Sequence, residues 1–303
     1  EELLENKFIR VDDSEFNFLG KPCKGSSIIN SEFYSGNKYR TLCSMGELSQ
    51  KIIDYGNLRN QIDFFFGTLI IDLKHQEDQW ILTSKDGKIF RSKYLICSSN
   101  LLLHKRSIDI LDVNQIPLKK AIPDNNNLYF DFLLKILSQQ SYIQRLTFLI
   151  YTGENYQYKD NYFKKYRYFC LEKDLEEKYK IERVIFQLQE NKKIGIVIHT
   201  KNLELINQFH KDNGEFTLKM SISRKFNELF EGNCRINQLS GNENISIMRW
   251  RASQPTGLAV PLSFQFSKKY KIGFCGDWFE GQGFGRIEGA ILSALYLAEK
   301  FNS

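Results

Sequence analysis

Long apolar runs, clustered metal ligands and repeats are all missing from this sequence. No apolar stretch approaches the ~20 residues that a membrane-spanning helix needs. Its six cysteines form no Cys-x-x-Cys pair and its four histidines are scattered, so neither a zinc site nor a disulfide framework is expected. The sequence has no Walker phosphate loop, no Ser/His/Asp order and no low-complexity tract. Unpaired cysteines fit a reducing compartment, and we expect a cytoplasmic protein.

What is present favours a packed globular protein. The 303 residues are 42% hydrophobic and 14% aromatic, and the net charge of +6 is mild. One patch, Lys159–Tyr168, alternates basic and aromatic residues. It could bind single-stranded nucleic acid, or it could be an exposed strand with tyrosines on one face and lysines on the other. We favour the strand because no nucleic-acid motif accompanies the patch. We expect neither nucleic acid nor membrane as a partner, and the oligomeric state stays open.

The first third of the chain predicts a helix followed by strands. Ser44 and Glu47 form a capping box that starts a helix, which Gly56 ends. From Ile62 to Cys97 the pattern changes to strands, and Asp86-Gly87 marks a hairpin turn. The last apolar run there, Tyr94–Cys97, predicts a strand that is buried on both faces.

The middle of the chain predicts an antiparallel sheet with helices. Periodicity is lost over residues 99–125, and strand patterns then recur at 141–151, 164–171, 181–189 and 194–200. A helix is expected at about 215–230, with apolar residues on one face. These elements suggest an α+β domain, which the chain leaves at about residue 245.

The C-terminal stretch carries the clearest functional pattern. Ile272–Cys275 predicts a buried strand, Gly276-Asp277 follows, and a glycine-rich loop leads to a helix that starts near Arg286. Glycines permit close approach of a ligand, a helix N-terminus offers free N–H donors, and a carboxylate accepts bonds from sugar or ribityl hydroxyls. The pattern therefore suggests a nucleotide-type cofactor site, although a helix merely packed on a sheet would also fit. Helical spacing predicts one apolar face made of Ile287, Ala290, Ile291, Ala294, Leu297, Ala298 and Phe301.

The order Gly276-Asp277, glycine-rich gap and Glu288-Gly289-Ala290 resembles the C-terminal flavin-binding motif of FAD-dependent amine oxidases. Within that superfamily the chain is most similar to renalase-like flavoproteins. The likeness covers most of the chain, weakly in the middle and well at both ends. The further strings that resemble the family are residues 1–10, Tyr39–Ile53, Leu69–Cys97 with Trp80, Ile196–Thr200 and Trp250–Gln254.

The resemblance implies FAD as the cofactor. It implies that Asp277 faces the ribityl–phosphate part of FAD, that the helix start faces the flavin N1–C2=O edge, and that the Leu69 backbone contacts adenine. Core packing is the alternative role for Leu69. The cofactor-binding residues expected on this basis are Leu69, Gly276, Asp277, Gly285, Arg286, Ile287, Glu288, Gly289 and Ala290.

The family's N-terminal strand, Gly-x-Gly-x-x-Gly turn and helix have no counterpart here. We expect that the sequence is a fragment of a longer protein; the alternative is that half of the cofactor site was lost. The expected fold class is α/β plus α+β, a Rossmann-like FAD domain interleaved with an antiparallel-sheet substrate domain. The predicted segments are 1–38 as a substrate-domain lead-in, 39–106 and 244–303 as FAD domain, and 107–243 as substrate domain.

Three candidate catalytic residues come from the same resemblance. His199 would line the substrate side of the flavin, where it could hydrogen-bond a carboxamide or phosphate or carry a proton. Trp250 would form an aromatic wall beside the isoalloxazine, and Arg251 would aim a cation at flavin or substrate. Each also has a structural alternative: a satisfied strand histidine, a core tryptophan and a surface arginine. The supporting candidates are Trp278, Phe279, Arg145 and Tyr142.

The implied activity is that of an FAD-dependent oxidoreductase. In the renalase-like form, hydride passes from a dihydronicotinamide-type substrate, possibly a nicotinamide dinucleotide, to flavin, and oxygen is the acceptor. The alternatives are a flavin amine oxidase or desaturase-type enzyme and a non-catalytic relative that acts as a binding module. A cofactor that carries the hydride also explains why the sequence shows few catalytic side chains.

Overall fold

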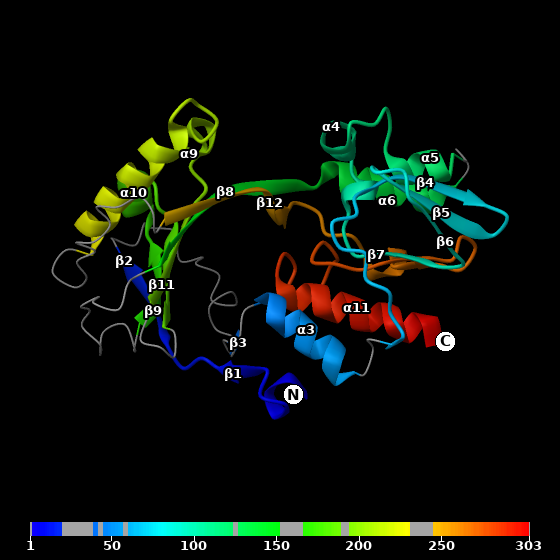
Figure 1. Cartoon of the computed structure of the whole chain (residues 1–303), viewed down its shortest axis with the longest axis horizontal. Coiled ribbons are helices and arrows are strands. Elements are labelled where there is room, and N and C mark those ends of the chain that lie inside the picture. Colours follow the sequence, from blue (N-terminus) through cyan, green and yellow to red (C-terminus); the bar gives the residue numbers. More distant parts are fainter. Residues whose placement is uncertain are drawn as a thin grey trace. The chain divides into compact units, whose positions relative to one another are not determined.

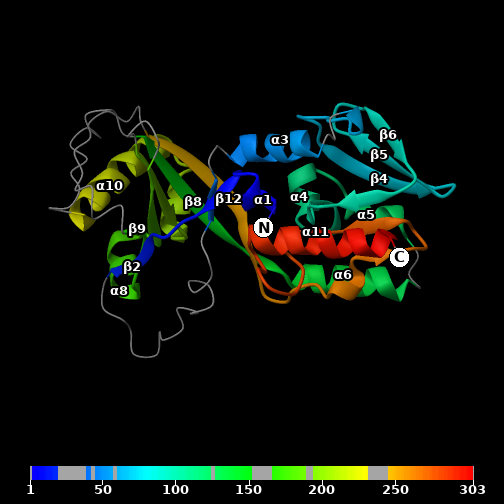
Figure 2. The same cartoon turned by 90° about the horizontal axis from the view of Figure 1, so that it is seen from below.

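The computed structural model describes residues 2–19, 39–41, 45–56, 60–123, 127–151, 166–188, 194–230 and 245–302 (Figures 1 and 2). The predicted N-cap Ser44 and most of the Lys159–Tyr168 patch lie outside these ranges. The chain divides into two compact units, each made of two segments: Glu1–Asp63 with Gln144–Arg251, and Phe64–Ile143 with Ala252–Ser303.

The first unit is built on a six-stranded sheet of order β12-β8-β11-β10-β9-β2. The β8–β11, β11–β10 and β10–β9 pairs are antiparallel, whereas β2 runs parallel to β9. Alternating sequence patterns predicted β8 to β11 at nearly these positions. The strands are β2 (Glu15–Leu19), β8 (Ser141–Tyr151), β9 (Tyr166–Leu171), β10 (Arg183–Leu188), β11 (Ile194–Thr200) and β12 (Ile245–Thr256).

Helices α9 (Leu203–Gln208) and α10 (Gly214–Leu229) lie along one face of this sheet (Figure 1). Every second strand residue points to that face, and these side chains form the first core with the apolar side of α10. Phe186 of β10 is buried against Phe226 of α10 and against Phe230, with the Phe186 and Phe230 ring centroids 5.5 Å apart. The remaining strand residues point to the opposite face of the sheet.

Short elements complete the first unit: α1 (Glu2–Glu5), β1 (Ile9–Val11), β3 (Tyr39–Thr41), α3 (Met45–Tyr55) and α8 (Lys173–Tyr179). α3 ends where the sequence predicted, because Gly56 N–H donates to Ile52 O at 3.1 Å and closes the last turn.

The second unit holds two three-stranded sheets. The antiparallel β4 (Ile70–Gln76), β5 (Gln79–Ser84) and β6 (Ile89–Ser92) include the predicted hairpin, whose Gly87 has φ +83°. In the other sheet β14 (Ile272–Phe274) pairs parallel with β7 (Leu95–Cys97) and antiparallel with β13 (Phe266–Ser267). The helices are η2 (Leu101–Leu103), α4 (Ser107–Leu111), α5 (Pro117–Ala121), α6 (Leu128–Gln139), η4 (Leu262–Phe264) and α11 (Ile287–Asn302).

Two features differ from the sequence predictions. Ile96 is 53% exposed, so β7 buries one face and not both. The unit boundaries also differ from the predicted 106/107 and 243/244, because α5 and α6 pack into the core of the second unit through Leu118, Phe130 and Leu133.

The cysteines that the structure describes, Cys97, Cys170 and Cys275, are buried free thiols. Over the described ranges, no helix combines the length and apolarity needed to cross a membrane. The same residues hold no cluster of three or more His, Cys, Asp or Glu that could bind a metal.

Candidate functional site

The strand-to-helix turn after β14 is shaped by its glycines. Gly276 has φ +147°, and a Cβ there would lie 2.3 Å from Trp278 Nε1, so a larger residue cannot fit. Its N–H donates to the buried Ser293 Oγ at 2.8 Å. Farther along, Gly285 N–H donates to Asp277 O at 2.7 Å. These two bonds fix the backbone on both sides of Asp277.

The loop and the start of α11 touch backbone to backbone. A Cβ on Gly289 would lie 2.3 Å from Gly283 O, and a Cβ on Gly283 would lie 2.5 Å from Gly289 N. Gly289 therefore has a packing reason within the protein itself. Because the helix begins at Ile287, the N–H groups of its first three residues have no acceptor inside the helix, whereas Ala290 N–H donates to Arg286 O at 3.1 Å.

The predicted single apolar face of α11 is divided in two. Leu297 is 3% exposed and contacts Gly273 of β14. Ile287 is 63% exposed and Ile291 is 47% exposed, so these two residues do not pack into the core of their unit. The helix buries the side nearest β14 only.

Asp277 belongs to a polar group in the second unit that we call the Asp277 cluster: Asn100, Arg106, Tyr142 and Asp277. Arg106 Nη2 donates to Asn100 Oδ1 at 2.7 Å, its guanidinium lies 4.1 Å from the Tyr142 ring centroid, and Asn100 Nδ2 donates to Tyr142 Oη. Burial raises the pKa of the Asp277 carboxyl, and the positive charge of Arg106 opposes that rise.

Sequence reasoning found Asp277 and Tyr142 but missed Asn100 and Arg106. The missed signal was topological. Cys97 and Phe274 are register partners at the ends of the parallel strands β7 and β14, and Asn100 and Asp277 each follow three residues later. Ligands of open parallel sheets bind beyond the carboxyl ends of the strands. The pairing of β7 with β14 had to be known first.

Three other candidate residues of this unit are Trp278, Phe279 and Leu69, and the structure shows what each of them contacts. Trp278 and Phe279 are each 2% exposed and pack in the second core, with their ring centroids 4.3 Å apart. They are buried because the turn at Gly276 directs the chain back under β14. Leu69 is 42% exposed, and its carbonyl accepts from Lys85 N–H at 2.8 Å.

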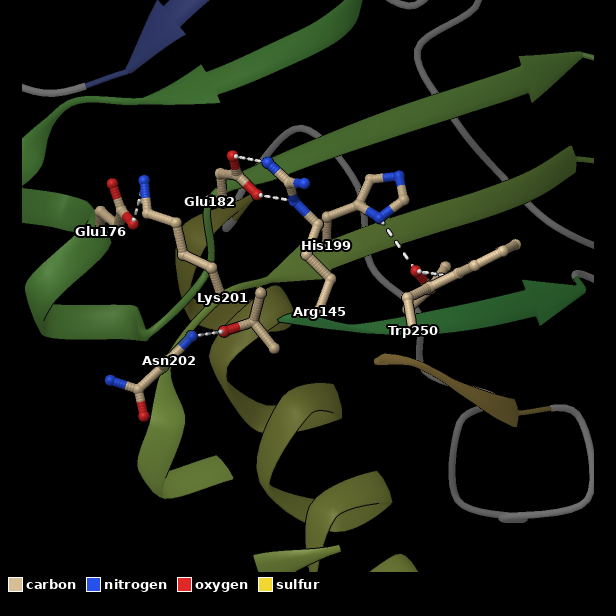
Figure 3. A network of polar contacts seen from close by, with 9 residues as sticks. Arg145, Glu176, Glu182, His199, Lys201, Asn202 and Trp250 are labelled. Atoms are coloured by element: carbon tan, nitrogen blue, oxygen red, sulfur yellow. Dashed lines mark hydrogen bonds and ion pairs between the residues drawn. The ribbon is translucent and has the colours of Figure 1, made fainter. Parts of the chain in front are cut away.

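In the first unit the structure brings His199 and Trp250 together through a residue that sequence reasoning missed. Trp250 Nε1–H donates to Thr147 Oγ1 at 3.0 Å, and Thr147 Oγ1 lies 3.0 Å from His199 Nδ1 (Figure 3). Burial and the charge of Arg183 lower the pKa of His199 to about 4. His199 is therefore a neutral imidazole at pH 7, with one ring N–H that can donate and one ring nitrogen that can accept. Arg251 is exposed.

Arg145 has a structural partner. Its Nε and Nη2 donate to Glu182 Oε2 and Oε1 at 2.7 and 2.9 Å (Figure 3). The bidentate pair is nearly buried and holds the pKa of Glu182 at about 2.

Comparison with known proteins gives a likeness of fold. No protein-family model and no curated protein matches the chain. Cyclohexylamine oxidase from Brevibacterium oxydans IH-35A is similar at a TM-score of 0.56 and 13% identity, over 88% of this chain and 55% of that one. Putrescine oxidase bound to putrescine is similar at a TM-score of 0.58 and 10% identity, over 92% of this chain and 57% of that one. A putative protoporphyrinogen oxidase from Exiguobacterium sp. 255-15 is similar at a TM-score of 0.54 and 9% identity, over 89% of this chain and 53% of that one.

The chain thus has a mixed α/β fold similar to that of these oxidases. It spans little more than half the length of each of them.

Proposed function

We propose that this chain is part of an FAD-dependent oxidoreductase. The observation that carries the proposal is the Asp277 cluster, which follows the carboxyl ends of the parallel strands β7 and β14, with α11 starting after the same loop. The likeness of fold to three oxidases supports the reaction class. The resemblance of Gly276-Asp277 and Glu288-Gly289-Ala290 to a flavin-binding motif supports the cofactor.

The residues present fit FAD chemically. A half-buried carboxylate at Asp277 can accept bonds from ribityl hydroxyls. The N–H groups of Ile287, Glu288 and Gly289, which have no acceptor inside the helix, can donate to a carbonyl or to developing negative charge. Bound flavin would supply the hydride acceptor, which no side chain of this chain can replace.

Each side chain would have a holding role. Arg106 favours the ionised form of Asp277, Asn100 and Tyr142 hold the Arg106 guanidinium in place, and Ser293 holds the turn at Gly276. Positioning of this kind, rather than acid–base catalysis, is what flavin chemistry requires of the protein.

For the substrate we propose a dihydronicotinamide-type compound that passes hydride to flavin, with oxygen as the acceptor. Sequence resemblance to renalase-like flavoproteins supports this choice. An amine is the alternative, because two of the structurally similar proteins are a cyclohexylamine oxidase and a putrescine oxidase.

The test is FAD titration of the chain and of Asp277→Asn, followed by flavin fluorescence. Losing one hydrogen bond to a charged group costs roughly 1.5–3 kcal/mol, or about one to two decades of affinity. Glu299→Gln, which changes an exposed acid on α11 of the same unit, is the control and should bind FAD as the unaltered chain does. Equal affinity in all three proteins would contradict a role for Asp277, and no flavin binding to any of them would contradict the assignment for this chain.

A further inference from the structure

The second face of the six-stranded sheet, opposite α9 and α10, carries a row of side chains that crosses its strands. Register pairs Thr147 with His199, His199 with Arg183, Arg183 with Cys170, and Cys170 with Phe18. Residues that face one another across neighbouring strands point to the same side of a sheet. Trp250 of β12 extends the row by its bond to Thr147. We call this set the polar row: Trp250, Thr147, His199, Arg183, Cys170 and Phe18.

An apolar row lies beside it, two residues along each strand. Leu149 pairs with Val197, Val197 with Ile185, and Ile185 with Tyr168. Both ends of the polar row are accessible, since Trp250 is 45% exposed and Phe18 is 39% exposed. Between these ends Thr147, Cys170 and Val197 are buried, so the contact surface of the two rows is formed by their less buried members, among them Leu149 and Ile185.

Arg183 is the charged residue of the polar row. Its Nε is buried without a hydrogen-bond acceptor, and its guanidinium forms no ion pair with any residue in the described ranges. The neighbouring acid, Glu182, gives both carboxylate oxygens to Arg145. A part-buried guanidinium that lacks a partner among these residues is costly, and an acceptor supplied by a ligand would offset that cost.

His199 adds a neutral polar atom next to this charge. Its Nδ1 faces Thr147, which leaves Nε2 on the other side of the ring (Figure 3). When the Thr147 hydroxyl donates to Nδ1, Nε2 carries the proton and can donate it to an acceptor bound at Arg183. Two donors, one of them cationic, thus lie on adjacent strands.

We propose that this sheet face binds an anionic ligand, a carboxylate or phosphate joined to a flat apolar group, and that the substrate of the proposed oxidase is of this class. The anion would pair with Arg183 and accept from His199, and the flat group would lie over the apolar row and Trp250. An ammonium ion would meet the positive charge of Arg183 at the same place and would be repelled. The inference rests on the proposed function only where it calls this ligand the substrate.

The test uses the flavin-free 303-residue chain and three small probes of similar shape: benzoate, phenyl phosphate and benzylammonium. Affinity is measured by calorimetry, and the tryptophan fluorescence of Trp250 is compared with that of Trp250→Phe to show where the probe binds. We expect both anions to bind more tightly than benzylammonium by about ten-fold or more, because a charge-assisted bond to Arg distinguishes the probes. The stronger of the two anions identifies the source as a carboxylate or a phosphate.

Arg183→Gln should weaken the binding of the better anion by about ten- to a hundred-fold. Arg183→Lys, which keeps the charge but loses the fork of donors, should recover part of the loss. The matched control is Arg224→Gln, which removes a 74% exposed arginine from α10 of the same unit and should change nothing. Circular dichroism shows whether each variant is folded.

Several results would overturn the proposal. Benzylammonium binding as tightly as benzoate, or more tightly, refutes it in the unaltered chain, so the test survives even if Arg183→Gln does not fold. An equal loss in Arg224→Gln shows general attraction to a basic protein. If the chain takes up FAD but prefers benzylammonium, this inference is wrong and the proposed function stands. If the chain prefers the anions but never binds FAD, only the proposed function is wrong.

Discussion

The Asp277 cluster and the polar row each place an arginine near a titratable side chain, but that side chain is an acid in the first case and a base in the second. In the second unit, Asp277 is half-buried but lies near the guanidinium of Arg106, and that cation opposes the rise in its pKa. In the first unit, His199 is part-buried near Arg183; burial and that cation lower its pKa to about 4. A neighbouring cation thus favours the ionised form of an acid and the neutral form of a base. One site offers a charged acceptor, and the other offers an uncharged imidazole beside the guanidinium of Arg183.

The largest effect should come from breaking the ion pair that sets Arg145 apart from Arg183. Arg145→Leu leaves Glu182 nearly buried and uncompensated, and we expect a loss of about 3–5 kcal/mol in the free energy of unfolding. Arg183→Gln should cost less than about 1 kcal/mol, because Arg183 forms no ion pair with the residues that the structure describes. Urea denaturation measures both. Adding Glu182→Leu to Arg145→Leu should recover most of the loss, and a failure to recover would show that packing, not the pair, is responsible.

The next effect concerns pH and the first unit. The folded-state pKa of His199, about 4, lies below its unfolded value of about 6.5, so the unfolded chain binds the extra proton between these values. Stability is fully present above pH 6.5 and falls as pH drops toward 4, by up to about 3 kcal/mol. Denaturant unfolding at several pH values measures the loss.

The same pH series on His199→Gln isolates this contribution. The variant should show a smaller loss between pH 6.5 and pH 4, because it has no imidazole to protonate at this position. His210 follows α9 in the same unit and is exposed, so His210→Gln serves as the control and should leave the pH dependence unchanged. Identical curves for His199→Gln and the unaltered chain would contradict a neutral buried His199.

A smaller effect tests the cation of the second unit. Arg106→Gln removes the charge that opposes protonation of Asp277, so the pKa of Asp277 should rise further. The carboxylate is the form that accepts hydrogen bonds, so FAD affinity should begin to fall at a higher pH in the variant as the pH is lowered. We expect a loss of roughly three- to ten-fold in the pH range where the carboxyl is protonated in the variant only.

FAD titration across pH checks this prediction. Arg91→Gln, which alters an exposed arginine on β6 of the same unit, is the matched control. If both variants lose affinity equally and with the same pH dependence, Arg106 acts only through the net charge of the protein.

Sequence patterns predicted the elements better than the sites. Strands β8 to β11 and helix α10 were predictable because alternation and helical periodicity are local signals. The Asp277 cluster and the polar row were not, because Asn100 meets Tyr142 and Thr147 meets His199 only after distant strands have paired. The exposed half of α11 shows the same limit, since periodicity identifies an apolar stripe but not what covers it.

The smallest expected change is in the free energy of unfolding of Gly289→Ala, and its direction distinguishes two explanations for this glycine. The sequence leaves two reasons for a glycine in the first turn of α11, close approach of a cofactor or packing within the protein. The structure shows the packing directly, because a Cβ would lie 2.3 Å from Gly283 O. Overpacking costs typically about 1–3 kcal/mol, and Gly→Ala in a helix gains about 1 kcal/mol, so Gly289→Ala should lower the free energy of unfolding by about 1 kcal/mol.

Gly46 supplies the matched control, because a Cβ at this position of α3 would meet nothing within 4 Å. Gly46→Ala should therefore raise the free energy of unfolding by about 1 kcal/mol through helix propensity alone. The two substitutions are chemically identical and each lies in the first turn of a helix, so opposite signs in urea denaturation can arise only from what surrounds the added methyl group. If both stabilise the protein, the loop at Gly283 yields without cost, packing does not account for Gly289, and close approach of a cofactor becomes the reason that remains.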